Sequence, residues 1–339
     1  MPVYKARKLA TLLPLVATAL VLAACGGAED TTESSSASGG EGGGGGKTLS
    51  LVAYSTPQVV YDEIIPAFKQ TPGGEGVDFK TSYGASGDQS RAVEGGLEAD
   101  YVSFSTEGDM RRLVDAGLVG ADWEAKQPGD GLVTTSVVSF VVREGNPKDI
   151  RTWEDLLRDD VEVLTPNPFS SGAAKWNLLA AYGANDLEYV RELINDHVKV
   201  QDKSGREALQ NFLSGAGDVL LSYEYEAITA QKKGEKVDYV IPDETIKIDI
   251  EAAVTKDAPA EAEAFHDFVL SEAGQQRFAD WGYRPVNPKV LKAADFPTPA
   301  GLFTIDEFGG WEKIDAELFD PENGSIAKIE EEAGVSTAK

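Results

Sequence analysis

The stretch Ser82-Tyr83-Gly84-Ala85-Ser86-Gly87-Asp88-Gln89-Ser90 joins a short apolar run to a helix-like pattern. The same arrangement returns in Thr165-Pro166-Asn167-Pro168-Phe169-Ser170-Ser171-Gly172-Ala173-Ala174-Lys175-Trp176. In each copy a strand-like segment, 77–82 or 161–165, stops at Gly or Pro, and Ser-Gly then leads into the helix. The first turn of a helix leaves backbone N–H groups without partners, and a small residue at the cap lets an anion approach them. Two such ends facing each other would form an anion site of neutral donors and helix dipoles.

The body of the chain, from about Thr48 onward, alternates between strand-like and helix-like stretches. Residues 49–54 form a strand-like run, and Ser55-Thr56-Pro57 then supplies a third start signal for a helix. Further strands are expected at 100–104, 135–143, 161–165, 218–222, 237–241 and 248–254, and helices at 107–116, 173–182, 187–195, 206–213 and 260–270. This alternation predicts an α/β fold with mainly parallel sheets flanked by helices. Ligands of such sheets bind outside the carboxyl ends of the strands, where all three turns fall.

Residues 1–24 have the pattern of a bacterial secretory signal peptide. A basic segment, 5–8, precedes an apolar stretch, 9–24, that is too short for a membrane-spanning helix. The string Leu22-Ala23-Ala24-Cys25 resembles a lipobox, so we expect Cys25 to become the lipid-bearing first residue of the mature protein. The alternative is a free or buried thiol. Because Cys25 is the only cysteine, an intramolecular disulfide and a thiolate metal cluster are excluded.

The lipidated Cys25 is followed by a segment that cannot form a packed core. Residues 26–47 consist almost entirely of Gly, Ser, Thr, Ala and acidic residues, a composition typical of a flexible tether. About 290 residues remain beyond it, enough for two lobes or one large α/β domain. We therefore expect a folded body held at the membrane by a lipid anchor and the linker 25–47.

The charge balance of the chain is strongly acidic. Its formal net charge is −26, from 31 basic and 57 acidic side chains. Such a surface repels the phosphate backbone, so a nucleic-acid partner is excluded. It also repels a small anion at long range. An anion site in this protein must therefore depend on local, dehydrated hydrogen bonds and dipoles.

Residue patterns of catalysis are missing from the sequence. The two histidines, His197 and His266, lie in helix-like surroundings without a metal-ligand pattern, so we expect packing or surface roles for them. No G-x-S-x-G elbow, P-loop or G-x-G-x-x-G turn is present. We therefore predict a protein that is not an enzyme and that needs no metal or organic cofactor. A secreted α/β enzyme acting on a phosphorylated or sulfated substrate is the less favoured alternative.

Several strings along the body carry a resemblance to a known family. They are Ser82-Tyr83-Gly84-Ala85-Ser86-Gly87, Gly96-Leu97-Glu98-Ala99-Asp100, Thr165-Pro166-Asn167-Pro168 with Ser170-Ser171-Gly172, Trp176-Asn177, Gly217-Asp218-Val219-Leu220-Leu221, Tyr283-Arg284-Pro285, and 303–311, Phe-Thr-Ile-Asp-Glu-Phe-Gly-Gly-Trp. In this order, over residues 51–313, the chain resembles the sulfate-binding proteins of bacterial ABC importers. The resemblance implies the two-lobed type II periplasmic-binding-protein fold. It places residues 48–134 and 249–339 in lobe 1 and 135–248 in lobe 2, with hinge crossings near 135–142 and 245–254.

The resemblance also implies one dehydrated sulfate held between the lobes by neutral donors. Ser86 and Ser171 would donate hydroxyl and backbone hydrogen bonds, and Gly172 and Ala173 would donate backbone N–H groups. Ser55 would offer a backbone N–H from the first strand end. The family's next donor falls on Gly205, for which a simple helix cap is the alternative.

Two residues depart from the family pattern. Tyr223 stands where the family commonly has a tryptophan that donates to the anion. A phenol can accept as well as donate, and the alternative for Tyr223 is a packed aromatic. Asp88 stands where a basic residue is common. If Asp88 faced the ligand it would favour a protonated oxyanion such as phosphate. The favoured alternative is that Asp88 points to solvent in the first helical turn.

Lys175 and Arg206 follow two of the turns and could balance the dianion from behind the direct contacts, or could be surface charges.

Together these features predict a monomeric receptor at the extracytoplasmic face of the membrane that delivers sulfate to an ABC permease. The alternatives within the fold are thiosulfate, molybdate or tungstate, and phosphate. Packing of the tail after Ile314 stays open.

Overall fold

The computed structural model describes residues 47–125 and 129–338. One mixed sheet runs in the order β2-β1-β3-β9-β4-β7-β5-β6, with β8 and β10 paired to β4 and β11 paired to β9. The strands are β1 Lys47–Tyr54, β2 Val77–Gly84, β3 Tyr101–Phe104, β4 Leu132–Arg143, β5 Val163–Pro166, β6 Val198–Asp202, β7 Val219–Tyr223, β8 Val237–Val240, β9 Glu244–Val254, β10 Arg284–Pro285 and β11 Gly301–Phe303. The expected signal peptide, Cys25 and nearly all of the expected linker lie outside the described residues.

Helices follow most strands, as the alternating pattern predicts. They are α1 Gln58–Phe68, α2 Ser86–Glu94, α3 Glu107–Asp115, α4 Gly172–Ala184, α5 Leu187–Glu192, α6 Gly205–Leu213, α7 Glu224–Lys232, α8 Ala260–Leu270, α9 Glu272–Asp280, α10 Pro288–Ala294, α11 Gly310–Glu317 and α12 Ser325–Glu332, with short turns η1 Glu154–Leu157, η2 Leu193–His197 and η3 Ile305–Phe308. Pro57 occupies the N-cap position of α1, one residue before the first helical residue, Gln58. The predicted fold class, a two-lobed α/β protein, is confirmed.

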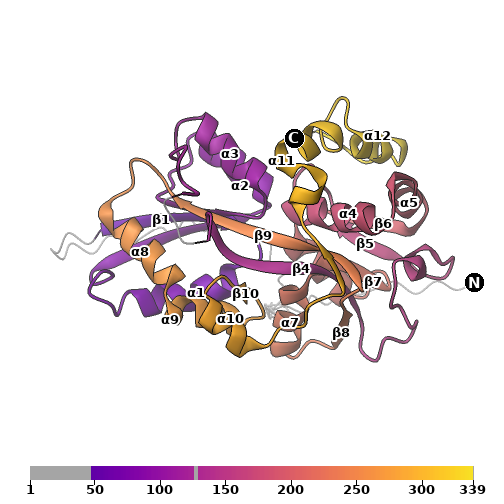
Figure 1. The fold of residues 1–339 in the computed structure, drawn as a ribbon, viewed down its shortest axis with the longest axis horizontal. Helices are drawn as coiled ribbons and strands as arrows, with labels where there is room; N and C mark the ends of the chain where they lie inside the picture. The colour runs from indigo at the N-terminus through magenta and orange to yellow at the C-terminus, as the bar shows by residue number, and fades with distance from the viewer. Residues whose placement is uncertain (1–46, 126–128, 339) are drawn as a thin grey trace, which may run out of the picture.

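Two long strands connect the lobes. Figure 1 shows β4 and β9 running side by side across the middle of the molecule, and their antiparallel pairing extends from Leu132 to Val137. The lobe around β1, β2 and β3 and the lobe around β5, β6 and β7 each have parallel strands. β4 and β9 run antiparallel to each other, β4 also runs antiparallel to β7 and β9 to β3, and only the short β11 pairs with β9 in parallel within the described residues. The two expected hinge crossings correspond to these strands.

A packed apolar interior extends through both lobes. In the first lobe an aromatic group centres on Phe265, which lies 5.1 Å from Tyr101 and 5.2 Å from Phe68 between ring centroids. In the second, apolar residues of β5 and β7 pack beneath α4 and α6. Aromatic and aliphatic burial of this kind supplies the main favourable free energy of folding. It also makes each lobe a firm platform for the turns at its sheet edge.

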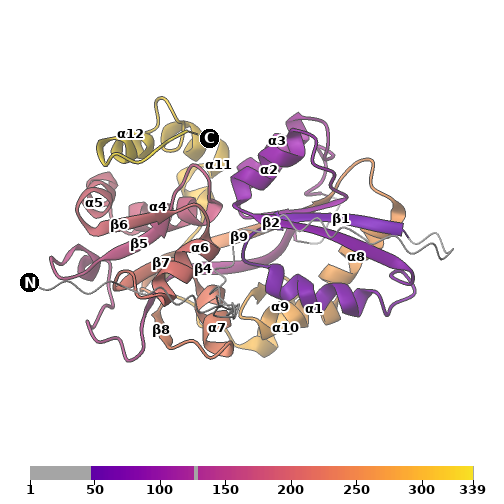
Figure 2. The same cartoon turned by 180° about the vertical axis from the view of Figure 1, so that it is seen from behind.

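The C-terminal tail packs on the body. Trp311 of α11 forms an edge-to-face pair with Trp176 of α4, with ring centroids 4.7 Å apart, and Ile314 and Phe319 are buried nearby. Helix α12 contacts α5 and η2, and α11 contacts α3. Figures 1 and 2 show α11 between α3 and α4, with α12 over the second lobe. The sequence-based expectation places residues 249–339 in lobe 1. The last helix of this segment, α12, packs against α5 and η2 of the other lobe.

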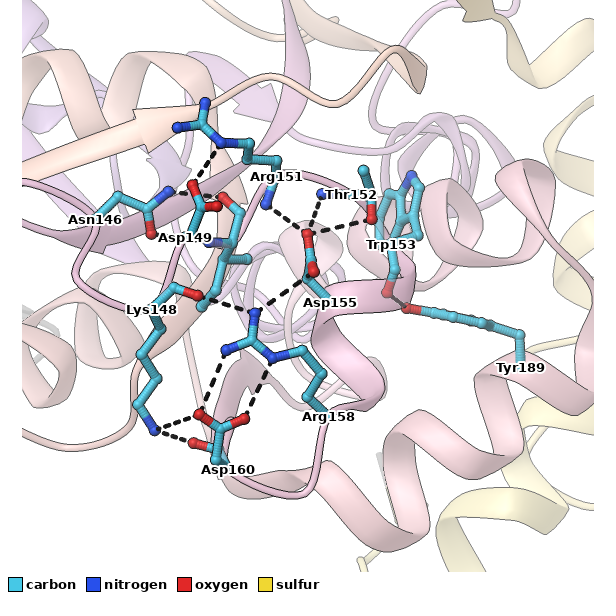
Figure 3. Close-up of polar contacts among 11 residues, drawn as sticks. Asn146, Lys148, Asp149, Arg151, Thr152, Trp153, Asp155, Arg158, Asp160 and Tyr189 are labelled. Atoms are coloured by element: carbon cyan, nitrogen blue, oxygen red, sulfur yellow. Dashed lines mark hydrogen bonds and ion pairs between the residues drawn. The ribbon is translucent and has the colours of Figure 1, made fainter.

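The loop between β4 and β5 is held by its own polar groups (Figure 3). We call residues 146–160 the 146–160 loop. Arg158 donates to the Lys148 carbonyl at 2.9 Å and to the Asp160 carboxylate at 3.2 Å. Asp155 accepts from the backbone N–H groups of Arg151 and Thr152 at 2.9 and 3.0 Å. Arg158 and Asp155 thus find partners within the loop, while Lys148 also pairs with Asp218 at 3.0 Å and the Trp153 indole donates to the Glu244 carbonyl at 2.9 Å.

None of the helices among the described residues is long and apolar enough to span a membrane.

Candidate anion site

Turns that follow the strands of both lobes meet at one place between them. We call this group the turn cluster; it comprises Ser55 and Thr56, Ser86 and Gly87, Ser105 and Thr106, Ser171 to Ala173, Ser204 and Gly205, and Tyr223. A methyl group at Gly172 would lie 2.1 Å from Ser105 Oγ, and one at Gly205 would lie 3.6 Å from both Ala173 and Thr56. The Gly87 N–H donates to the Ser170 carbonyl across the lobes at 3.1 Å. The helix N-termini therefore converge, as an anion site requires.

The β2–α2 turn is braced by an acidic side chain of the same lobe. Ser86 is buried, and its hydroxyl donates to Asp109 Oδ2 at 2.7 Å and accepts from the Ser105 N–H at 3.1 Å. Thr106 and Arg112 also donate to Asp109, both at 3.1 Å. The Ser86 hydroxyl that the sequence assigns to the anion is thus turned toward Asp109 in this structure. It would have to rotate to donate to a ligand.

In the β5–α4 turn, no side chain caps the N-terminus of α4 with a hydrogen bond. Ser171 caps α4 without a side-chain hydrogen bond to the helix, and Ser171, Gly172 and Ala173 are all buried. The preceding loop is shaped by Asn167, whose side-chain oxygen accepts from the Phe169 N–H at 2.7 Å. Since the cap hydroxyl is not used by its own helix, it is available to an anion at the N-terminus.

Ser55 and Gly205 lie on opposite lobes and are connected by Arg206. The Arg206 guanidinium donates to the Ser55 carbonyl, and Thr56 shares a 2.7 Å hydrogen bond with the Tyr225 hydroxyl. The α6 cap bond comes from Ser204, which accepts from the Glu207 N–H at 3.3 Å, so Gly205 is not needed as the cap. Arg206 thus contacts the backbone of the first lobe beside the turn cluster.

Tyr223 and Ser105 place two buried hydroxyls in the cluster. Tyr223 is 0% exposed and Ser105 is 1% exposed, and neither hydroxyl has a hydrogen-bond partner within the described part of the chain. Burial raises the pKa of Tyr223 well above its ordinary value. Buried hydroxyls without partners are costly, so a site that holds them is suited to a ligand that supplies acceptors.

Glu226 is a buried carboxyl group at the edge of the cluster. It is 4% exposed, accepts from the Ser222 hydroxyl, and lies 3.3 Å from a methyl group placed at Gly205. Burial raises its pKa to about 7, against the opposing effects of Ser222 and Arg206. A cleft of about 670 Å³ between α1, α6 and α7 opens beside it, and Thr56, Arg206 and Tyr225 line this cleft. The cleft connects the edge of the turn cluster with solvent.

Asp88 and Lys175 are both held in ion pairs. Asp88 pairs with Arg91 at 2.5 Å and, across the lobes, with Lys203 at 2.8 Å, and its side chain is 32% exposed. Lys175 pairs with Asp315 of α11 at 2.5 Å. Because its carboxylate is occupied by two cations, Asp88 bridges the lobes at the rim of the junction.

The two histidines pack in the body of the protein. His266 is buried beside the Tyr101 ring, with centroids 5.7 Å apart, and burial lowers its pKa to about 4. His197 is also buried, at the end of η2. In the described ranges, no three or more His, Cys, Asp and Glu side chains are grouped so as to hold a metal ion.

Sequence reasoning missed the β3–α3 turn. It predicted the strand 100–104 but did not assign Ser105, Thr106 or Asp109, which the structure brings against Ser86 and Gly172. The available signal was the same as for the other turns, because Ser105-Thr106 directly follows a strand at its carboxyl end. No glycine directly follows Ser105-Thr106, as one follows Ser86 and Ser171, and the predicted site did not include this pair.

Comparison with known proteins agrees with this geometry. The family described as bacterial extracellular solute-binding protein matches residues 49–284. A sulfate-binding protein of Synechococcus elongatus is 38% identical, over 89% of this chain and 90% of its own length. A thiosulfate-binding protein of Pseudomonas aeruginosa is 33% identical, over 79% of this chain and 88% of its own length. The solved structure of the sulfate-binding protein SubI from Mycobacterium tuberculosis is 47% identical with a TM-score of 0.78, and the match covers 81% of this chain and 100% of that one. The chain therefore belongs to the sulfate-binding protein family of bacterial extracellular solute-binding proteins.

Proposed function

We propose that this protein is a receptor that captures one sulfate dianion in the turn cluster and hands it to an ABC permease. The observation that carries the proposal is the convergence of neutral helix N-termini from both lobes, around buried hydroxyls that lack partners in the described residues. Sulfate at neutral pH has only acceptor oxygens, so it matches a site made of donors. The relatives of this protein are binding proteins of a family described as extracellular, which favours binding over catalysis.

The proposed direct contacts are Ser55, Ser86, Ser171, Gly172, Ala173, Gly205 and Tyr223. Backbone N–H groups at helix ends would stabilise much of the anion's negative charge. This stabilisation would offset the repulsion between the anion and the acidic chain. Arg206 and Lys175 would act from behind these contacts through Ser55 and Asp315. Asp88 would influence selectivity from the rim, through its pairing with Lys203.

Hinge closure would couple capture to delivery. The lobes touch through Gly87 and Ser170 and through Arg206 and Ser55, contacts that require the lobes to be close. A ligand that contacts both lobes shifts the population toward this closed form. The permease would then recognise the shape of the closed protein.

Calorimetric titration tests the ligand. Residues 47–339 would be titrated with sulfate, thiosulfate, phosphate and molybdate at fixed ionic strength. We expect tight sulfate binding and weaker binding of phosphate and molybdate. Heat and thermal stabilisation with phosphate but not sulfate would contradict the proposal. Thiosulfate binding tighter than sulfate binding would assign the receptor to the thiosulfate-binding branch of its relatives.

The lipid anchor is a separate part of the proposal and has its own test. Cells that express the full chain would be labelled with an alkyne-tagged fatty acid. We expect label on the wild-type protein in the membrane fraction and none on the Cys25→Ala variant. Equal labelling of both would show that Cys25 is not the acceptor.

A further inference from the structure

Glu226 belongs to α7, but its carboxyl group lies at the N-terminus of α6. The residue is 4% exposed, and its carboxyl group accepts from the Ser222 hydroxyl. A methyl group placed at Gly205, the first residue of α6, would lie 3.3 Å from Glu226 Oε2 and 3.6 Å from both Ala173 and Thr56. The carboxyl group of Glu226 and the first turns of α4 and α6 therefore surround the same point in the turn cluster.

The titratable and charged groups around Glu226 come from several elements. Four tyrosines have pKa values that burial raises above the ordinary value, so their hydroxyls are neutral near pH 7; they are Tyr54, Tyr223, Tyr225 and Tyr283. Arg206 of α6 lines the same cleft as Glu226 and favours its charged form. The other charged residues that line this cleft are Asp62 and Glu63 of α1, and Lys233 and Glu235 beyond the end of α7. Arg206 is thus a cation that offsets the Glu226 carboxylate while no anion is bound.

An anion held by the first turns of α4 and α6 would lie beside this buried carboxyl group. Two negative charges close together in a buried site raise the pKa of the group that can take up a proton. Sulfate carries no proton at neutral pH, so the proton has to come from solvent and go to the carboxyl group. Burial already raises the pKa of Glu226 to about 7 without an anion, so little free energy is needed to protonate it at neutral pH.

We propose that Glu226 is a proton-binding site linked to the anion site: sulfate enters the turn cluster together with one proton from solvent, which forms an O–H bond with the Glu226 carboxylate. This inference rests on the proposed function, in which Ala173 and Gly205 contact sulfate. The protein then gains one negative charge on binding in place of two, which reduces the repulsion from its acidic surface. Binding of sulfate weakens as the pH rises above 7, because more of the empty protein has to be protonated.

Calorimetry in two buffers counts the protons. Sulfate would be titrated into the full chain at pH 8 in Tris and in triethanolamine, whose ionisation enthalpies differ, so that proton uptake changes the observed heat. We expect uptake of about one proton per sulfate. Sulfate affinity should fall about 10-fold between pH 8 and pH 9, and it should stay level between pH 5 and pH 6, where Glu226 is already protonated.

Two substitutions assign the proton to Glu226. Glu226→Gln resembles the protonated form, so proton uptake should disappear and sulfate affinity at pH 8 should be about 10-fold tighter than in the wild type. A purely structural role would weaken binding instead. Ser222→Ala keeps the carboxyl group but removes a donor that stabilises its charged form, so less proton uptake is expected at pH 8.

The matched control is Glu235→Gln, which removes an exposed carboxylate from the same cleft and should show wild-type proton uptake. Thermal unfolding without ligand would show that each variant is folded, and Ser222→Ala decides if Glu226→Gln is not. Equal heats in both buffers for the wild type, unchanged uptake in Glu226→Gln, or weaker binding by folded Glu226→Gln at pH 8 would overturn the inference while leaving the receptor function intact. Absence of sulfate binding by the unaltered protein would instead overturn the proposed function and the inference with it.

Discussion

The turn cluster and the 146–160 loop are both polar, yet they use their hydrogen-bonding groups in opposite ways. In the loop, Arg158 donates to the Lys148 carbonyl and to the carboxylates of Asp155 and Asp160, and Asp155 accepts from the backbone of Arg151 and Thr152. In the cluster, Ser105 and Tyr223 keep buried hydroxyls without partners among the described residues. The loop is partly exposed and charged, whereas the cluster is buried and built largely of neutral groups.

Polar groups in the loop bond largely to one another and contribute to stability, whereas those in the cluster are proposed to bind a ligand. Exposed ion pairs contribute little to stability, and water can replace them when they are lost. A buried donor without a partner costs free energy, and a ligand that accepts a hydrogen bond from it recovers part of that cost. The cluster should therefore respond to substitution through ligand binding, and the loop through small changes in stability.

Gly172→Ala is expected to have the largest effect. The added methyl would lie 2.1 Å from Ser105 Oγ and 3.0 Å from Thr106 Cγ2, so these side chains would have to move before the two turns could meet as they do here. Overpacking at such a contact should weaken sulfate binding roughly 100-fold in calorimetry. Gly95→Ala is the control, because its methyl comes no closer than 3.2 Å to another atom. Wild-type affinity in Gly172→Ala would show that these turns do not meet in the bound form.

Glu226→Gln should change the pH dependence of stability in the absence of ligand. The folded pKa of Glu226 is about 7, raised from 4.5, so the folded state binds a proton more tightly than the unfolded state. This contribution is fully present below pH 4.5 and is lost as the pH rises through 7. Denaturant unfolding should show the variant more stable than the wild type by up to about 3 kcal/mol at pH 8, and the difference should become small near pH 4.5.

The control for Glu226→Gln is the exposed residue Glu235, whose replacement by Gln should leave the pH profile of stability unchanged. A Glu226→Gln profile parallel to that of the wild type would contradict the raised pKa.

Ser171→Ala tests the open cap of α4. Its hydroxyl makes no capping bond to the helix, so we expect the loss to appear in binding and not in stability. Sulfate affinity should fall about 10-fold, the value typical of a hydrogen bond to a charged group. Ser170→Ala removes a neighbouring hydroxyl that already donates to the Lys203 carbonyl at 2.7 Å, and it should not change affinity. A lower melting temperature with unchanged affinity in Ser171→Ala would assign the hydroxyl a structural role.

Arg158→Ala in the 146–160 loop should have the smallest effect. Its ion pairs are partly exposed, so we expect a melting temperature lowered by a few degrees at most, and less at high salt. Sulfate affinity should not change, because Arg158 contacts only this loop among the described residues. A marked loss of sulfate binding would break the distinction between the two regions.

Local residue patterns predicted much of the fold. The order of strands and helices follows from apolar periodicity and from caps such as Ser171-Gly172, since both depend on near neighbours in the chain. The expected crossings at 135–142 and 245–254 correspond to β4 and β9. The antiparallel direction of these strands and the docking of α11 against α4 did not follow from any local signal. They depend on contacts such as Trp176 with Trp311, which are far apart in sequence.

The sequence by itself determined that neutral Ser-Gly turns end strands in both halves of the chain, because cap chemistry is local to each turn. Only the tertiary structure decided how their hydroxyls are used. It turns Ser86 toward Asp109, occupies Asp88 with Arg91 and Lys203, and leaves Ser105 and Tyr223 without partners in the described residues. A hydrogen bond depends on the distance between two atoms, and partners far apart in the sequence, such as Ser86 and Asp109 or Asp88 and Lys203, are brought together only by folding.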